Sequence, residues 1–456
     1  MDSSAVDNKV PITPDPIPST SLSSQKQQEV EHSNETTTAD QTDCALEAGQ
    51  KRKSEIDSSA EEPKTKQPRR QKQQRRDDDF RKDDLSSVEY YFENGLRKVK
   101  PYFFVYRAYA KGRWMHRPLL QVFVQEFQDR DEKYYRYAIE NGLITINDEK
   151  KSLDYIVKNN DIMGHRIHRH EPAVTNKPIQ IVHRQDDLLV INKPGGIPVH
   201  PAGRYRHNTV IHVLRKTLDV PRLFPANRLD RPTSGLMLIG LNPDKAREFE
   251  AQMKEGLIRK EYVCRVAGKF PDGEVVCDAP IKTISYKLSL NYVHGDGKEC
   301  KTVFERLSYN GETSVVRCRP VTGRTHQIRV HLRFLGYPIA NDPTYSDEAP
   351  WADLMCKGQT LNDEMADKIV QRALQVSPRQ VGIWEEDAHE KVKTQQLGED
   401  VEGKCSECGL NLSPDPRPEN LYIWLHAWKY SGDGWSFETE MPEWAKDEQN
   451  TPSSSA

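Results

Sequence analysis

The sequence predicts a mixed α/β fold (class α+β) with a central, largely antiparallel sheet. Segments in which apolar residues alternate, as in strands, are interleaved with segments of helical periodicity. In "PIQIVHRQDDLLVINKPGG" two apolar runs flank Asp186 and Asp187, which is the pattern of a hairpin. Because hairpins join antiparallel neighbours, we expect antiparallel pairing to dominate the sheet.

Composition limits the classes of protein to consider. The chain has 456 residues, enough for two or three domains. It is 36% hydrophobic and 30% charged, so part of it is expected to stay unfolded. The net charge of -3 means that any nucleic-acid surface must be local. Eight cysteines that mostly stand alone, without a signal peptide or an apolar span, predict free thiols in a reducing compartment and no membrane partner.

The first 173 residues predict a tail and a small module. Residues 1–85 are rich in polar residues and are expected to be disordered. Within them, the basic clusters Lys51–Lys53 and Lys64–Arg76 indicate nuclear import or non-specific RNA contact, with a solvated charged tail as the alternative. Residues 86–173 predict strands over "YYFENGLRKVKPYFFVYRAY", then two helices, a turn and a strand over "LITIN".

The rest of the chain predicts a main domain interrupted by an insertion. Residues 174–345 contain the hairpin, two helices, a strand over "KEYVCRVAGKF", and a strand, turn and helix over "SVVRCRPVTGRTHQIRVHLRF". The first two helices are expected at Thr209–Leu218 and Asp244–Gly256, and Thr325 is expected to cap the third, near His326. Residues 346–420 form an acidic, irregular insertion, 421–446 supply a final strand, and 447–456 are a polar tail.

The stretch "NRLDRPTSGLMLIG" places Asp230 between Arg228 and Arg231 at the start of an apolar strand. Taken alone, it reads as a polar turn with a surface ion pair. Two later segments also bring polar residues beside apolar cores: Lys260-Glu261-Tyr262, and "TGRTHQIRVH" with Arg324, His326, Gln327, Arg329 and His331. A carboxylate beside a guanidinium stays ionised and can act as a nucleophile or a weak base.

Five motifs together resemble the RluA-like pseudouridine synthases. In the family's order they are "NKPGGIPVHP", "NRLDRPTSGLML", "KEYVCRVAG", "GRTHQIRVHLRFLGYPIANDPTY" and "LHA". The resemblance covers residues 90–345 well and 421–446 less firmly. "FENGLRKVKPY", "HRHEP" and "GRYRHNT" resemble the eukaryotic branch that contains anticodon-loop tRNA synthases. The resemblance implies the pseudouridine synthase catalytic fold, preceded by a degenerate ribosomal-protein-type RNA-binding module.

The same resemblance implies a cofactor-free isomerisation of uridine in RNA. The N1–C1′ bond breaks, the base turns, and a C5–C1′ bond forms after the base has left its stack. Asp230 occupies the place of the catalytic aspartate, which either attacks the sugar or removes a sugar proton. Tyr262 matches the tyrosine that stacks on the flipped uracil, and Arg329 matches the partner of the aspartate. Arg228 matches the residue that fills the vacated stack, a role that suits a planar guanidinium.

Other polar residues have weaker assignments. Lys193 is a candidate for a phosphate contact, and Arg324 is a supporting residue. His326 is expected to orient the loop or cap the helix, and His331 to be structural. Asn227 stands where many relatives have histidine and is given no catalytic role.

The sequence gives little support to a metal site or to another class of enzyme. "CSECG", Cys405–Gly409, is a single CxxC motif, whereas a structural zinc needs four ligands, and no spacing supports Cys356 or His389 as partners. We therefore assign no metal and no cofactor. A zinc deaminase is excluded because its H-x-E and P-C-x-x-C motifs do not occur. An RNA-binding or RNA-chaperone protein is the non-catalytic alternative.

The partner is expected to be RNA. The branch resemblance points to position 32 of the tRNA anticodon loop, with rRNA or mRNA as alternatives. We expect a monomer in the nucleus, the cytoplasm or both, and mitochondria stay open.

Overall fold

The computed structural model describes residues 85–446, except 128–129, 287, 352–356, 376–404, 406, 409–411 and 413. The tails predicted at 1–85 and 447–456 therefore lie outside the described residues, apart from Leu85. Within the described part, no helix is both long enough and apolar enough to cross a membrane.

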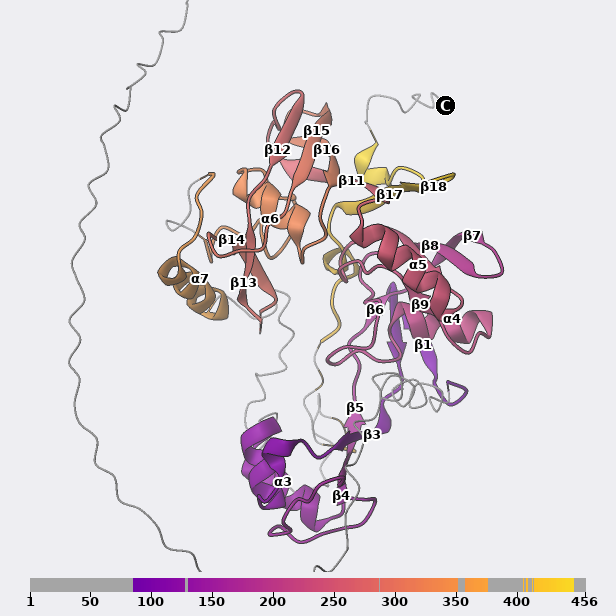
Figure 1. Cartoon of the computed structure of the whole chain (residues 1–456), viewed down its shortest axis with the longest axis vertical. Helices are drawn as coiled ribbons and strands as arrows, with labels where there is room; N and C mark the ends of the chain where they lie inside the picture. The colour runs from indigo at the N-terminus through magenta and orange to yellow at the C-terminus, as the bar shows by residue number, and fades with distance from the viewer. Residues whose placement is uncertain are drawn as a thin grey trace, which may run out of the picture. The chain divides into compact units, whose positions relative to one another are not determined.

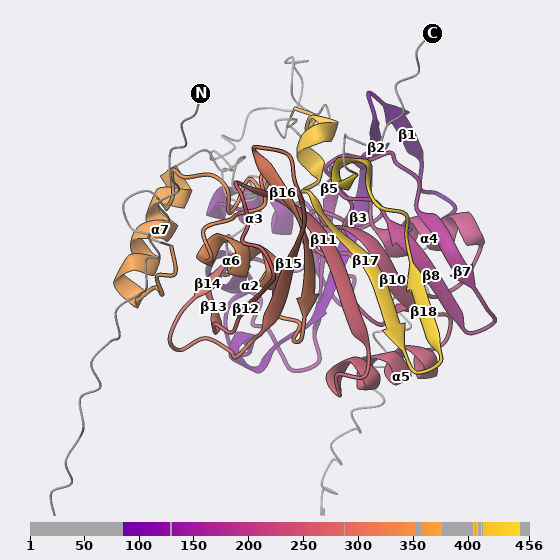
Figure 2. The ribbon, with the colours of Figure 1, turned by 90° about the horizontal axis from the view of Figure 1, so that it is seen from above.

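A ten-stranded sheet forms the centre of the main domain (Figures 1 and 2). Its main path runs β12-β15-β16-β11-β17-β10-β8-β7, with β18 paired to β17 and β9 paired to β10. The strands are β7 (Gln180–Arg184), β8 (Leu188–Lys193), β9 (Phe224–Pro225), β10 (Ser234–Gly240), β11 (Arg259–Ala267), β12 (Glu274–Cys277), β15 (Thr302–Tyr309), β16 (Thr313–Pro320), β17 (Leu425–Gly432) and β18 (Trp435–Glu438). Every pairing is antiparallel except that of β10 with β17. The predicted fold class and the predicted β7–β8 hairpin are confirmed.

Two hydrophobic cores lie on the two halves of this sheet. One joins β8 and β10 to α4 (Val210–Leu218) and α5 (Pro243–Lys254). The other joins β11 and β16 to β13 (Ile281–Ser285), β14 (Leu290–Val293) and α6 (Gln327–Phe334). The α4 and α5 starts are set by Thr209 and Asn242, whose side chains accept hydrogen bonds from backbone amides of the first turn. Both helices lie within two residues of their predicted bounds.

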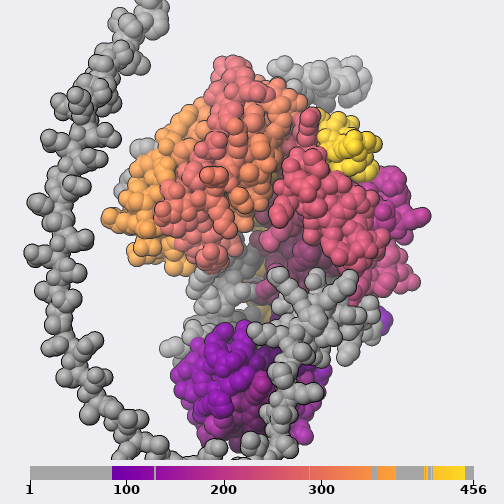
Figure 3. All heavy atoms as spheres, in the orientation of Figure 1, coloured from indigo at the N-terminus to yellow at the C-terminus, as the bar shows by residue number. Residues whose placement is uncertain are grey.

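Two predicted details of the elements are wrong. The start of α6 is not capped by Thr325: the helix begins at Gln327, and His326 stands before it in a left-handed conformation with φ 56°. The insertion is not irregular throughout, because α7 (Asp363–Gln375) buries Ile369 and Ala373 in the core around β13 and β14. Figure 3 shows α7 continuous with the surface of that half of the domain.

The segment predicted as a small module contains a three-stranded sheet and a separate hydrophobic core. Strands β3 (Tyr102–Tyr109), β5 (Ile162–Arg169) and β4 (Ile144–Ile146) pair in that order. Helices α2 (Leu119–Val122) and α3 (Glu132–Glu140) contribute buried residues to the core together with β4 and β5. A second small sheet contains β1 (Tyr90–Glu93), β2 (Leu96–Val99) and β6 (Val174–Thr175). Short helical turns complete the chain: η1 (Gly112–Trp114), η2 (Phe123–Phe127), η4 (Pro418–Leu421) and η5 (Glu443–Ala445).

Candidate active site

The Asp230 loop is fixed at the point where β10 meets β17. Asn227 accepts a hydrogen bond from the backbone N–H of Leu238 at 3.0 Å and donates one to the Tyr430 hydroxyl at 3.3 Å. Gly235 has φ 115°, and the backbone of Ala427 occupies the space where a side chain at this position would lie. Asn227, which was given no catalytic role, therefore ties the loop to two strands of the sheet.

Lys193 supports the same loop through hydrogen bonds to backbone carbonyl groups. Its side chain is fully buried, and its ammonium donates to the carbonyl oxygens of Pro194, Ile197 and Arg231 at 2.9, 2.9 and 3.2 Å. Burial lowers the pKa of Lys193 to about 7, against the opposing charge of Asp230. Three acceptors match the three protons of an ammonium. The phosphate contact considered for Lys193 is thus wrong: the lysine holds the backbone beside Asp230.

Arg329 faces Asp230 but is anchored by another carboxylate. Its Nη1 lies 3.4 Å from Asp230 Oδ2, whereas its Nε and Nη2 donate to Asp342 at 2.6 and 2.9 Å. The side chains of Arg329 and Asp342 are 4% and 0% exposed, and that of Asp230 is 23% exposed. The buried pair therefore orients the guanidinium, and Asp230 keeps an oxygen accessible to a substrate.

His326 completes this side of the site. Its Nε2 lies 3.6 Å from Asp230 Oδ2, and its Nδ1 lies 3.0 Å from the Tyr345 hydroxyl. That hydroxyl accepts the backbone N–H of Asn291, so its own proton is free to go to Nδ1. This arrangement selects the tautomer with the proton on Nε2, directed at Asp230. His326 makes no side-chain cap to α6, so its predicted role as a cap is wrong, and the alternative role of orienting the loop fits its contacts.

The charge state of the site follows from these contacts. Burial raises the pKa of Asp230, but His326 in its protonated form, Arg329 and Arg228 outweigh this effect and leave that pKa below its usual value. Burial and Arg329 lower the pKa of His326 to about 4, so this histidine is neutral at pH 7. At neutral pH the site thus holds an ionised carboxylate facing a guanidinium and a neutral imidazole.

Tyr262 lies on β11 at a bulge in its pairing with β17, where its ring is half-buried. Its hydroxyl lies 2.9 Å from that of the buried Tyr430. Burial raises the pKa of Tyr262 to about 12, and the charge of Asp230 adds to this rise. A neutral phenol is therefore held near the carboxylate, with part of its ring accessible to a flat ligand.

Two of the predicted residues, Arg228 and Arg324, are exposed. Arg228 is exposed, two residues from Asp230, and contributes to the electrostatics of both Asp230 and His326. Arg324 is exposed and donates from Nε to the carbonyl oxygen of Glu299 at 3.1 Å. His331 is buried and contacts Thr302 Oγ1 at 2.9 Å, so its predicted structural role is confirmed.

Sequence reasoning missed the supporting residues Asp342, Tyr345 and Tyr430. The first two lie inside the motif "GYPIANDPTY", where a carboxylate and a phenol followed a helix rich in arginine, and the third follows "LHA". Their positions in otherwise apolar segments were the signal. No local spacing states which partner each one meets.

Comparisons with known proteins identify the family of this chain. The family model for RNA pseudouridylate synthase matches residues 187–334. The chain is 43% identical to the mitochondrial tRNA pseudouridine(32) synthase of Saccharomyces cerevisiae, over 77% of each chain. It is 38% identical to human pseudouridylate synthase RPUSD2, over 81% of this chain and 77% of the relative. It is also 36% identical to rice RNA pseudouridine synthase 7, over 78% of this chain and 92% of the relative.

Proposed function

The chain belongs to the RNA pseudouridylate synthase family, and we propose that it isomerises uridine 32 of the tRNA anticodon loop to pseudouridine. The enzyme class and RNA as the substrate follow from the family. The choice of tRNA and of position 32 is supported by the name of the yeast relative, with which the chain shares 43% identity.

One arrangement supports the catalytic assignment: the partly exposed Asp230 carboxylate faces the Arg329 guanidinium at 3.4 Å. It also lies near enough to Tyr262 for its charge to raise the pKa of that phenol. A carboxylate without a nearby positive charge would repel the phosphates of RNA. Asp230 is compensated by a guanidinium and fixed by a loop that a buried lysine supports. We infer that it acts on the sugar of a uridine whose base has left the stack.

Each residue then has a defined part in the reaction. The ring of Tyr262 receives the flipped uracil by stacking, and Arg228 enters the gap that the base leaves. Asp230 attacks C1′ or removes a sugar proton, and the N1–C1′ bond breaks. The base turns, C5 bonds to C1′, and the C5 proton goes to solvent while N1 gains one. Arg329 holds Asp230 in place and in its ionised form.

Tritium release from [5-³H]uridine-labelled anticodon stem-loops tests this proposal, because only C5–C1′ bond formation expels the C5 label. The full chain is compared on two RNAs that differ only in carrying uridine or cytidine at position 32. We expect release from the first RNA alone. Release from both RNAs would refute the position, and no release from any tRNA would refute the substrate.

Two matched variants test the residue assignment in the same assay. Asp230→Asn preserves shape and removes the charge, and we expect the rate to fall by on the order of 10⁴-fold or more. Asp186→Asn makes the same change at an exposed position on the β7–β8 turn and should leave the rate unchanged. Activity retained by Asp230→Asn would overturn the assignment.

The compartment and oligomeric state are proposed separately. The basic clusters Lys51–Lys53 and Lys64–Arg76, which lie outside the described residues, support nuclear import, and the name of the yeast relative adds mitochondria as a destination. Fluorescent fusions of the intact chain and of a chain with both clusters neutralised distinguish these destinations. We propose a monomer, which sedimentation of the purified chain tests.

A further inference from the structure

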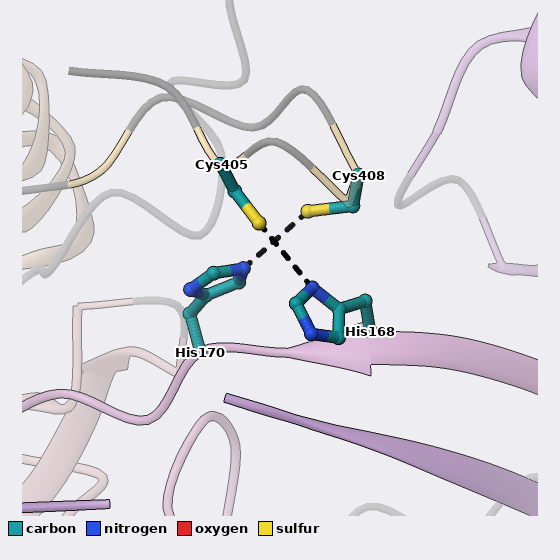
Figure 4. A group of neighbouring side chains, drawn as sticks. All are labelled: His168, His170, Cys405 and Cys408. Atoms are coloured by element: carbon teal, nitrogen blue, oxygen red, sulfur yellow. Dashed lines mark hydrogen bonds between the residues drawn. The ribbon is translucent and has the colours of Figure 1, made fainter. Parts of the chain in front are cut away.

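Four side chains that the reaction does not use converge beside the small module (Figure 4). His168 lies on β5 and His170 just beyond its end, two residues apart, so both point to the same side. Cys405 and Cys408 come from the segment that precedes η4 and β17. The four potential ligand atoms all lie within 4.8 Å of one another.

The distances in this cluster match those of a tetrahedral metal site. Cys405 Sγ lies 3.4 Å from His168 Nδ1, and Cys408 Sγ lies 3.4 Å from His170 Nε2. Bonds of about 2.3 Å from zinc to sulfur and about 2.0 Å from zinc to nitrogen, at a tetrahedral angle, place sulfur and nitrogen about 3.5 Å apart. In the view of Figure 4 the two contacts overlap, as opposite edges of a tetrahedron do in projection.

We propose that His168, His170, Cys405 and Cys408 bind one structural Zn²⁺ ion. Two thiolates and two imidazoles form a closed Cys₂His₂ set, which leaves no position for a substrate. The two residues between the cysteines are the usual spacing for a pair of zinc ligands on one turn. The donors belong to segments 237 residues apart, and the metal links them.

The site lies next to contacts that lead to the catalytic loop. Between the two histidines, Arg169 donates to the carbonyl oxygen of Gly203 at 2.9 Å. Two residues further, the Tyr205 hydroxyl accepts a hydrogen bond from Arg231 at 2.6 Å, and Arg231 follows Asp230. The metal would therefore fix the end of β5, which contacts the catalytic domain through Arg169. It would position this strand and take no part in the reaction.

Two metal-free arrangements compete with this proposal. A disulfide between Cys405 and Cys408 is one of them, but in the structure each of these sulfur atoms contacts an imidazole nitrogen instead. Two separate thiol–imidazole hydrogen bonds would explain each 3.4 Å contact, but they do not require the two pairs to meet. A shared cation explains both contacts and their convergence.

Metal analysis of the full chain tests the site without reference to enzyme activity. The protein is purified from zinc-supplemented cells, and its metal content is measured by mass spectrometry. We expect about one zinc per chain, and less than about a tenth of that in Cys405→Ser/Cys408→Ser. Cys44→Ser and His183→Asn, which change the same residue types elsewhere, should keep the full zinc content.

A second measurement uses the unaltered chain, so it does not depend on the folding of any variant. Titrating its thiols with an organomercurial should release the zinc, and cobalt substitution should give the visible spectrum of a tetrahedral thiolate site. Zinc absent from the purified chain and not taken up on titration would overturn the proposal. So would equal zinc content in Cys405→Ser/Cys408→Ser, or a denatured chain lighter by two hydrogen atoms, which would indicate a disulfide.

Discussion

The two carboxylates that contact Arg329 should differ sharply in what they contribute to stability. Asp342 accepts from Arg329 at 2.6 and 2.9 Å with both side chains buried, and it also accepts the backbone N–H of Thr344 at 2.9 Å. Asp342→Asn keeps the shape but leaves the buried guanidinium without its main counter-ion. Removing one partner of such a pair costs about 3–5 kcal/mol, and the oxygen that asparagine retains places this variant near 3 kcal/mol.

Asp230→Asn should behave differently in the same measurement. Its contact with Arg329 is 3.4 Å long and its side chain is 23% exposed, so the pair is screened by solvent. We expect the free energy of unfolding to change by less than about 1 kcal/mol. We expect the opposite order for activity, because Asp230 is the proposed catalytic residue. Asp342→Asn should misplace Arg329 and reduce tritium release less than Asp230→Asn does.

Urea unfolding followed by circular dichroism measures both variants against the unaltered chain, with Asp186→Asn as the surface control. The comparison uses differences in midpoint at a common slope, so it does not depend on the absolute free energy. An equal or greater loss of stability in Asp230→Asn would refute the conclusion that Asp342 anchors the arginine. Full activity in Asp342→Asn would refute its positioning role.

Three further outcomes follow from the structure. Gly235→Ala places a methyl group against the backbone of β17 at φ 115°, so this variant should not fold to a soluble protein. Gly112→Ala, which has open space around the added methyl group, should fold normally, and the yield of soluble protein measures both variants. Tyr262→Phe loses one hydroxyl contact but keeps the stacking ring, and should retain far more tritium release than Tyr262→Ala. His326 and His426 have pKa values of about 4 in the folded chain, so between pH 6.5 and 4 the unfolded chain binds more protons than the folded chain. The free energy of unfolding should therefore fall, as the pH is lowered, by up to about 1.4 kcal/mol per pH unit for each histidine. A urea midpoint that stays constant across this pH range would contradict the prediction.

Much of the fold was determined by local sequence patterns. The hairpin around Asp186 and Asp187 and the bounds of α4 and α5 follow from alternation, periodicity and capping residues, which act over a few residues. The sequence of α7 also has apolar residues at helical spacing, but the acidic composition of the insertion led to a prediction of irregular structure. The motif around Asp230 identified the family because it stands in order with four others.

Only the tertiary structure decided which polar groups meet. The sequence suggested a phosphate contact for Lys193, but its buried ammonium donates to three backbone carbonyls. The sequence paired Arg329 with Asp230, but Arg329 makes shorter hydrogen bonds to Asp342. The pair Cys405 and Cys408 had no visible partners in sequence because His168 and His170 lie more than 230 residues away. Spacing in the sequence predicts only which side chains lie on the same face of one helix or strand. Partners brought together by chain crossing are selected by packing and desolvation across the whole domain.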